Sequence, residues 1–137
     1  MKYKELLTWL KENGYIDSLN IDVVLRKFFN DYLKLRDPNS IIKIIGELEG
    51  LPENYATIKS RKKEIVAGRY MAMTLIKCNT KLNLSDIGWF FNKDRVTVTH
   101  AHKTIDNLIE TNKNFELKFN SYLKYFNLEY EKHDKSH

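Results

Sequence analysis

The chain has 137 residues, of which 42% are hydrophobic and 12% aromatic, and its formal net charge is +5. This length suits one domain with a short appendage, and the apolar content can form a core, which excludes wholesale disorder. No apolar run approaches the roughly 20 residues that a membrane span needs, and the amphipathic, glutamate-containing start of the chain is unlike a secretory signal. The single cysteine, Cys78, excludes an internal disulfide framework and a cysteine-based zinc site. We therefore expect a cytoplasmic protein with no membrane contact.

The positive charge is concentrated in one part of the chain. Residues 1–58 hold eight Lys and Arg against nine Asp and Glu, whereas residues 59–103 hold ten against three. Such a concentration beside a neutral half favours a polyanionic partner, and a solvated lysine-rich surface is the alternative.

Apolar residues recur at helical spacing along the whole chain, which predicts an all-α protein of roughly seven helices. The first two are expected over residues 2–13 and 20–36 and form an N-terminal helical pair. Ser40 is expected to cap a third helix over 41–49, and Pro52 to open a short helical piece that reaches residue 58. The remaining helices are expected over 63–78, 84–91, 95–110 and 114–127, before a frayed tail.

The stretch NKDRVTVTHAHKTI, residues 92–105, starts its helix on threonine, β-branched and basic residues, which are poorer helix formers than Leu, Ala or Glu. On a helical wheel one side becomes a core stripe of Val98, Ala101, Ile105 and Leu108. The other side presents Arg95, Val96, Thr99 and Lys103, with His100 on the flank. Arginine can donate two hydrogen bonds to guanine, and Thr or Val methyls can contact the thymine methyl. The pattern is typical of a DNA-binding helix-turn-helix, although many helical hairpins share it.

Four motifs, SRKKEIVAGRYMAM, LNLSDIG, FF and KDRVTVTHAHKTI, occur in that order over about residues 40–110. In order and spacing they resemble the C-terminal DNA-binding domain of the bacterial replication initiator DnaA. The resemblance implies a helical bundle that contains a helix-turn-helix, like the DnaA C-terminal domain and the Trp repressor. It divides the chain into an N-terminal helical extension (1–39), a DNA-binding domain (40–128) and a flexible tail (129–137).

The resemblance also implies which residues contact double-stranded DNA. A basic loop places an arginine in the minor groove, and here it contains Arg61, Lys62 and Lys63. The positions that hold the DNA backbone are occupied by Arg69, Tyr70 and Lys77, and by Leu84 and Ser85 through their main-chain amides. The base-contacting positions are Asp94, Arg95 and Val96, followed by Thr97 and His100 close to phosphate.

This chain departs from the family pattern within the basic segment, where Gly68 and Ala67 replace the proline and one arginine of RPRQ, and at three places in the helix-turn-helix. The turn NKD is one residue shorter than the family's GGRD, Arg95 stands where the family has histidine, and Val96 stands where it has threonine. Arg95 should favour guanine, and Val96 keeps a methyl but lacks the hydroxyl. We therefore expect a preferred DNA site that differs from the family's usual one.

No Gly-Lys pair occurs in the sequence, so it contains no phosphate loop for ATP, and we predict neither an enzyme nor a cofactor. His100 and His102 are two residues apart on a helix and do not face one another, so no metal site is expected. The leading hypothesis is sequence-specific DNA binding in replication or transcription control. The alternative is a protein-interaction module that has lost specific DNA binding and contacts a replication protein. Residues 1–39 either extend the core or form a homodimer or partner surface, and structured RNA is a third, weaker target.

Overall fold

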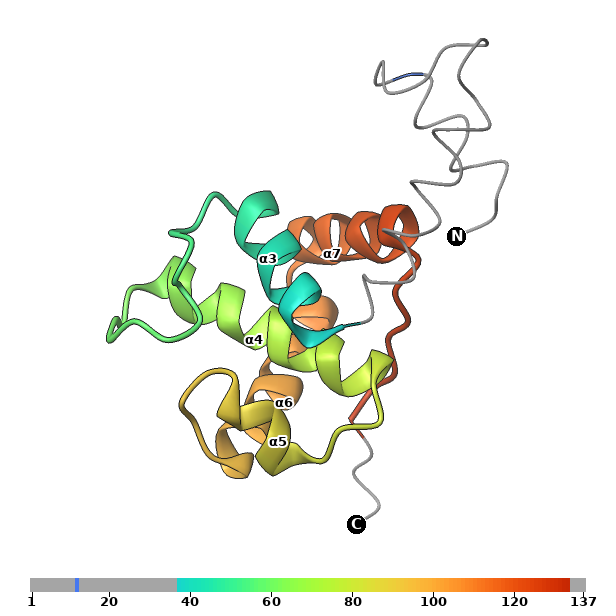
Figure 1. The fold of residues 1–137 in the computed structure, drawn as a ribbon. Helices are drawn as coiled ribbons and strands as arrows, with labels where there is room; N and C mark the ends of the chain where they lie inside the picture. The colour runs from blue at the N-terminus through green and yellow to red at the C-terminus, as the bar shows by residue number, and fades with distance from the viewer. Residues whose placement is uncertain (1–11, 13–36, 134–137) are drawn as a thin grey trace, which may run out of the picture.

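The computed structural model describes residue 12 and residues 37–133, and this part of the chain contains helices without any strand. The helices are α3 (Pro38–Leu48), α4 (Lys63–Asn79), α5 (Leu84–Trp89), α6 (Arg95–Thr111) and α7 (Lys113–Phe126) (Figure 1). The prediction of an all-α fold is confirmed. The two helices predicted over 2–13 and 20–36 lie outside the described residues.

Helix α4 is the centre of the bundle. Its residues from Met71 to Ile76 are all buried, and the helix packs against α3, α5 and α6 (Figure 1). A helix that is buried on several sides needs apolar residues around most of its circumference, and the sequence MAMTLI supplies them. Thr74, the one polar residue in this run, donates its hydroxyl to the carbonyl of Tyr70 at 2.8 Å and so remains satisfied in the core.

Helix α3 begins three residues earlier than the sequence pattern predicts. Pro38 occupies the first turn, and Asp37 rather than Ser40 is the N-cap residue. Proline suits this position because its fixed φ is already helical and its missing N–H would have no partner within the helix.

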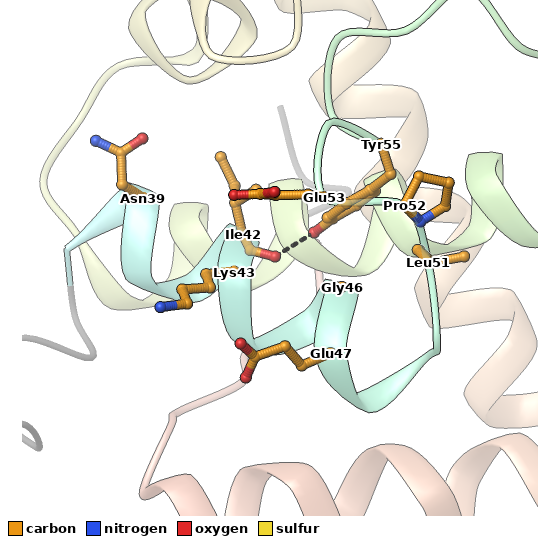
Figure 2. A pocket seen from close by; sticks show the side chains of 9 residues that line it. All are labelled: Asn39, Ile42, Lys43, Gly46, Glu47, Leu51, Pro52, Glu53 and Tyr55. Carbon is orange, nitrogen blue, oxygen red and sulfur yellow. Dashed lines mark hydrogen bonds between the residues drawn. The ribbon is translucent and has the colours of Figure 1, made fainter.

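The segment after α3 forms turns where a short helical piece was expected from Pro52 to residue 58. The side chain of Tyr55 explains the difference, because it is buried between α3 and α4 and its hydroxyl donates to the Ile42 carbonyl at 2.6 Å (Figure 2). A Cβ atom on Gly46 would lie 2.7 Å from Tyr55 Cε1, so the ring fits only against a glycine. Tertiary packing of one aromatic ring thus overrides the local helical pattern.

The chain beyond α7 returns along α4 and α6. Asn127 ends α7 in the left-handed conformation, and Leu128 is buried. Asn79 at the end of α4 then holds the backbone of Glu129, accepting from its amide at 2.8 Å and donating to its carbonyl at 3.0 Å. Residues 129–133 of the expected flexible tail thus contact α4 and α6 in the structure, and residues 134–137 lie outside the described part.

Candidate nucleic-acid interface

The helix-turn-helix is formed by α5, a short turn and α6. Each helix is capped by the residue before it: Asn83 Oδ1 accepts from the Asp86 amide at 2.8 Å, and Asp94 Oδ1 accepts from the Thr97 amide at 2.9 Å. Within the turn, Asn92 has a φ of 55°, and the Lys93 amide donates to the Gly88 carbonyl at 2.9 Å. These bonds fix the path by which the shortened turn enters α6.

Helix α6 buries one face and exposes the opposite one, as its wheel predicts. Val98, Ala101 and Ile105 are fully buried, and Leu108 is half-buried. The outer side carries the exposed Arg95, Val96, His100 and Lys103, with Thr99 half-buried. Val96 is 66% exposed, although an apolar side chain at a helix start gains nothing from contact with water. An exposed arginine beside an exposed valine is a combination that suits contact with base edges.

Asp94 and Thr97 already bind each other. Besides the amide bond, the Thr97 hydroxyl donates to Asp94 Oδ1 at 3.0 Å. The bonds from the Thr97 amide and hydroxyl lower the pKa of the Asp94 carboxyl. The Asp94 side chain therefore caps the N-terminus of α6 through Oδ1. A base contact by Asp94 would have to use its other carboxylate oxygen, Oδ2.

The basic loop leads directly into α4. Arg61, Lys62 and Lys63 are exposed, and Lys62 is the N-cap residue of α4 with no side-chain capping bond. Cations at a helix N-terminus are unfavourable, because the helix dipole places partial positive charge there. Three successive cations at this point therefore cost stability rather than add it, which is what an anion-binding surface requires.

Arg69, expected to hold DNA backbone, is buried in the structure. Only 5% of the residue is exposed. Its Nε donates to the Tyr55 carbonyl and its Nη1 to the Ser60 carbonyl, both at 2.9 Å, and its Nη2 donates to the Ile58 carbonyl. Arg69 thus holds the basic loop in place from inside the protein.

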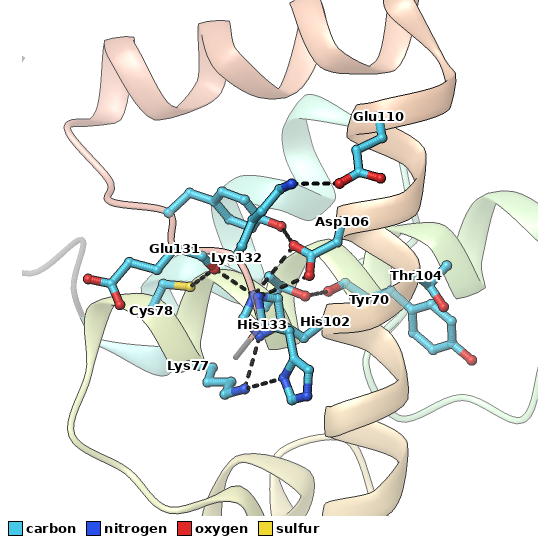
Figure 3. Close-up of polar contacts among 12 residues, drawn as sticks. Tyr70, Lys77, Cys78, His102, Thr104, Asp106, Glu110, Glu131, Lys132 and His133 are labelled. Carbon is cyan, nitrogen blue, oxygen red and sulfur yellow. Dashed lines mark hydrogen bonds and ion pairs between the residues drawn. The ribbon is translucent and has the colours of Figure 1, made fainter. Parts of the chain in front are cut away.

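Lys77 also points elsewhere than expected. Its Nζ lies 2.9 Å from His102 Nδ1 and 3.3 Å from His133 Nδ1, so it faces the C-terminal segment (Figure 3). Tyr70 is half-buried and packs edge-to-face on the His100 ring, with centroids 5.6 Å apart. Leu84 and Ser85, the first residues of α5, are half-buried and exposed respectively.

His100 and His102 lie on different sides of α6, since His100 is exposed and His102 is 3% exposed. Within the described part of the chain, no three His, Cys, Asp or Glu side chains are grouped closely enough to hold a metal ion. None of the helices described here is long and apolar enough to span a bilayer.

The surface of the part of the chain that the structure describes includes two hollows. One, of about 510 Å³, lies beside α3 and is lined by both charge signs, including Lys43, Glu47 and Glu53 (Figure 2). The other, of about 410 Å³, lies between the basic loop and the turn of the helix-turn-helix. Its lining includes Lys59 and Lys93, which the sequence pattern did not single out. The sequence signal for both is their position: Lys59 directly precedes the motif SRKKEIVAGRYMAM, and Lys93 is the first residue of the motif KDRVTVTHAHKTI.

Comparison with known proteins identifies relatives of this chain that include the helix-turn-helix. The family model described as the bacterial dnaA protein helix-turn-helix matches residues 38–105, about half of the chain. The chromosomal replication initiator protein DnaA of Bacteroides fragilis (strain YCH46) is 34% identical over 105 residues, which are 74% of this chain and 22% of that protein. The same-named protein of Bacteroides thetaiotaomicron is 39% identical over 79 residues, 57% of this chain and 17% of the relative.

The protein of that name from Chlorobaculum tepidum is 40% identical over 99 residues, 72% of this chain and 20% of its own length. The chain thus spans about a fifth of the length of these curated relatives. No solved structure matches the chain.

Proposed function

Since residues 38–105 of this chain belong to the family of bacterial DnaA helix-turn-helix domains, we propose that the protein binds duplex DNA sequence-specifically, in replication or transcription control. Membership of the family supports DNA binding through α5 and α6. The process, the use of the basic loop and the choice of bases are our proposals.

The distribution of ion pairs is the observation that carries the proposal. Among the described residues, the lysines in ion pairs are Lys113, Lys118 and Lys132, on α7 and the C-terminal segment. No described ion pair includes a cation of the basic loop or of the outer side of α6, namely Arg61, Lys62, Lys63, Arg95 and Lys103. These five cations therefore have no carboxylate partner in the described part of the chain and remain available for phosphates.

We propose two contacts with DNA on the basis of the exposed residues. Arg95, at the first position of α6, would donate to guanine O6 and N7 in the major groove, and Val96 would contact a thymine methyl. Arg61 and its neighbours would enter the adjacent minor groove. Arg69 contributes by fixing the loop that presents them, through its three bonds to loop carbonyls.

The proposal is tested by selection from random duplex DNA at two salt concentrations. Three proteins are compared: wild type, Arg95→Ala, and Lys124→Ala as a control that removes a cation from the exposed side of α7. We expect a motif with a guanine whose preference weakens in Arg95→Ala alone. Affinity should fall with salt by about 0.9 log unit per log unit of salt for each phosphate contacted. Absence of wild-type binding at low salt would overturn the proposal and favour the protein-interaction alternative.

We further propose that this chain acts without ATPase activity, because its sequence contains no Gly-Lys pair and hence no phosphate loop. Phosphate release from ATP measured with and without duplex DNA tests this directly. A turnover above background that copurifies with the chain would contradict it.

A further inference from the structure

The hollow of about 410 Å³ joins two segments that are far apart in the sequence. One wall belongs to the loop before α4 and the other to the turn between α5 and α6. The lining residues are Thr57, Ile58, Lys59, Ser60, Arg61, Arg69, Phe91, Asn92 and Lys93.

The geometry of duplex DNA indicates which part of the DNA would lie over this hollow. A minor groove and the adjacent major groove are separated by one sugar-phosphate strand. If Arg61 enters the minor groove and Arg95 the major groove, that strand has to pass between the basic loop and the start of α6. The hollow between the loop and the turn is the space on the protein that the strand would cross.

The chemistry of the rim suits a phosphodiester group. Lys59, Arg61 and Lys93 are all exposed, and none of them takes part in an ion pair within the described part of the chain. Amine and guanidinium groups are the usual partners of DNA phosphates. A cavity edged by three such groups and no carboxylate attracts an anion.

The loop carbonyls that would oppose an anion are already occupied. From inside the protein, the Arg69 guanidinium donates hydrogen bonds to the carbonyl oxygens of Ile58, Ser60 and Tyr55. The negative ends of these peptide dipoles therefore face a buried cation. These carbonyl oxygens therefore oppose an anion in the hollow less than unpaired carbonyls would.

The opposite wall is fixed before any ligand arrives. The Lys93 amide bonds to the Gly88 carbonyl at 2.9 Å, and Asn92 holds the left-handed conformation that lets the turn close. Lys93 thus reaches the hollow from an anchored backbone, which reduces the conformational entropy lost on binding.

We propose that this hollow seats one phosphate of the strand that separates the two contacted grooves, with Lys59 and Lys93 as its cationic contacts. The inference rests on the proposed DNA binding and adds to it two residues and one phosphate position. A phosphate bound in the hollow would fix the spacing between the minor-groove and the major-groove contacts.

The test uses the full chain and the duplex obtained by selection, with Lys59→Gln, Lys93→Gln, the double variant, and Lys124→Gln as control. Lys124 is an exposed cation on α7, which lies at the far end of the molecule from α5 (Figure 1). Binding constants are measured from 0.05 to about 0.3 M salt, on the selected duplex and on a scrambled one.

The double variant should reduce the salt slope by about 0.9 and weaken both duplexes roughly five- to tenfold at about 0.1 M salt, as expected for one lost phosphate contact, and each single variant should produce part of this change. The selected motif should stay unchanged, and Lys124→Gln should bind like wild type. A second measurement replaces single phosphates with uncharged methylphosphonates along the strand. One position between the two grooves should weaken wild type and leave the double variant unaffected.

Failure of this inference is distinguishable from failure of the proposed function. Specific, salt-dependent binding by wild type with an unchanged slope in Lys93→Gln and Lys59→Gln would overturn the phosphate seat alone. A changed motif in Lys93→Gln would make Lys93 a base contact and would also overturn it. No binding by wild type would overturn both.

Discussion

Arg69 Nη1 donates to the Ser60 carbonyl at 2.9 Å from inside the protein, directly beneath the loop whose outer surface carries Arg61. A buried cation therefore positions an exposed one. The two arginines lie only eight positions apart in the sequence and have opposite environments, so equal substitutions at the two sites should have different consequences.

Arg69→Met should destabilise the fold by about 2–3 kcal/mol, because three loop carbonyls would lose a charged donor in a buried place. Urea unfolding followed by circular dichroism measures this. Arg61→Met is the matched control and should change the free energy of unfolding by less than about 0.5 kcal/mol while weakening DNA binding. A stable Arg69→Met protein that no longer binds DNA would place the Arg69 guanidinium on the DNA instead.

Gly88→Ala should destabilise the helix-turn-helix although alanine is the better helix former. A Cβ at this position would lie 2.3 Å from the Lys93 carbonyl oxygen, and backbone must move to relieve that contact. Overpacking of this kind costs about 1–3 kcal/mol, whereas helix propensity alone would gain up to about 1 kcal/mol. The sign of the change in unfolding free energy thus decides between the two effects.

Thermal unfolding of Gly88→Ala beside Ser85→Ala, an exposed position of the same helix, makes that comparison. We also expect Gly88→Ala to bind selected DNA less selectively, since displacement of the turn changes how α6 enters the groove. A more stable protein with an unaltered motif would mean that the turn is not held against Gly88.

The outer side of α6 could be predicted from the sequence because it depends on periodicity alone. Val98, Ala101 and Ile105 recur at helical spacing, and burial follows that spacing in the structure. The same holds for the all-α class. The spacing of apolar residues is sufficient to predict burial where one face of a helix packs against the core.

The basic loop could not be predicted in the same way. Whether Arg69 faces DNA or the interior depends on carbonyls of residues 55–60, whose positions are set by the packing of Tyr55 between α3 and α4. The docked segment after α7 has a similar origin, since Asn79 holds Glu129 across fifty positions of sequence. Contacts between distant segments leave no periodic signal.

Asp94→Asn should keep α6 intact while changing the DNA preference. Asparagine can also accept from the Thr97 amide, so the N-cap bond survives, whereas Asp94→Ala removes the acceptor. Loss of the carboxylate removes repulsion from phosphates and also removes an acceptor for the cytosine amino group.

We therefore expect Asp94→Asn to bind all duplexes more tightly and to discriminate less among them. Selection from random duplexes at fixed salt measures both effects, and the thermal midpoints of the Asn and Ala variants separate capping from recognition. Equal selectivity in wild type and Asp94→Asn would exclude a base contact by this carboxylate.

His102 on α6 joins α4 to the C-terminal segment, and we expect the stability of this contact to depend on pH. His102 Nε2 lies 2.7 Å from the Glu131 carbonyl and therefore donates, which leaves Nδ1 to accept from Lys77 Nζ at 2.9 Å (Figure 3). Burial lowers the pKa of His102, with Lys77 and His133 acting in the same direction, while the Glu131 carbonyl and Asp106 oppose the shift. Only the neutral imidazole can both donate to the Glu131 carbonyl and accept from Lys77 Nζ.

Because the pKa of His102 is lower in the folded protein than in the unfolded chain, the unfolded state takes up more protons as the solution becomes acidic. The stabilisation by this ring is thus complete above the unfolded value of about 6.5 and is lost progressively as the pH falls through the folded pKa. A protonated Nδ1 would face the Lys77 ammonium, and the segment from Leu128 to His133 should be the first part to detach.

Urea unfolding between pH 7.5 and 5.5 tests this, since carboxyl groups with ordinary pKa values remain ionised there. Wild type should lose stability toward pH 5.5, and His102→Gln should show a flatter profile, because glutamine can donate to Glu131 without titrating. His100→Gln, at an exposed position of the same helix, should keep the wild-type slope. If His102→Gln and wild type lose stability in parallel, another group drives the transition, and His133→Gln would then identify or exclude the second imidazole bound to Lys77.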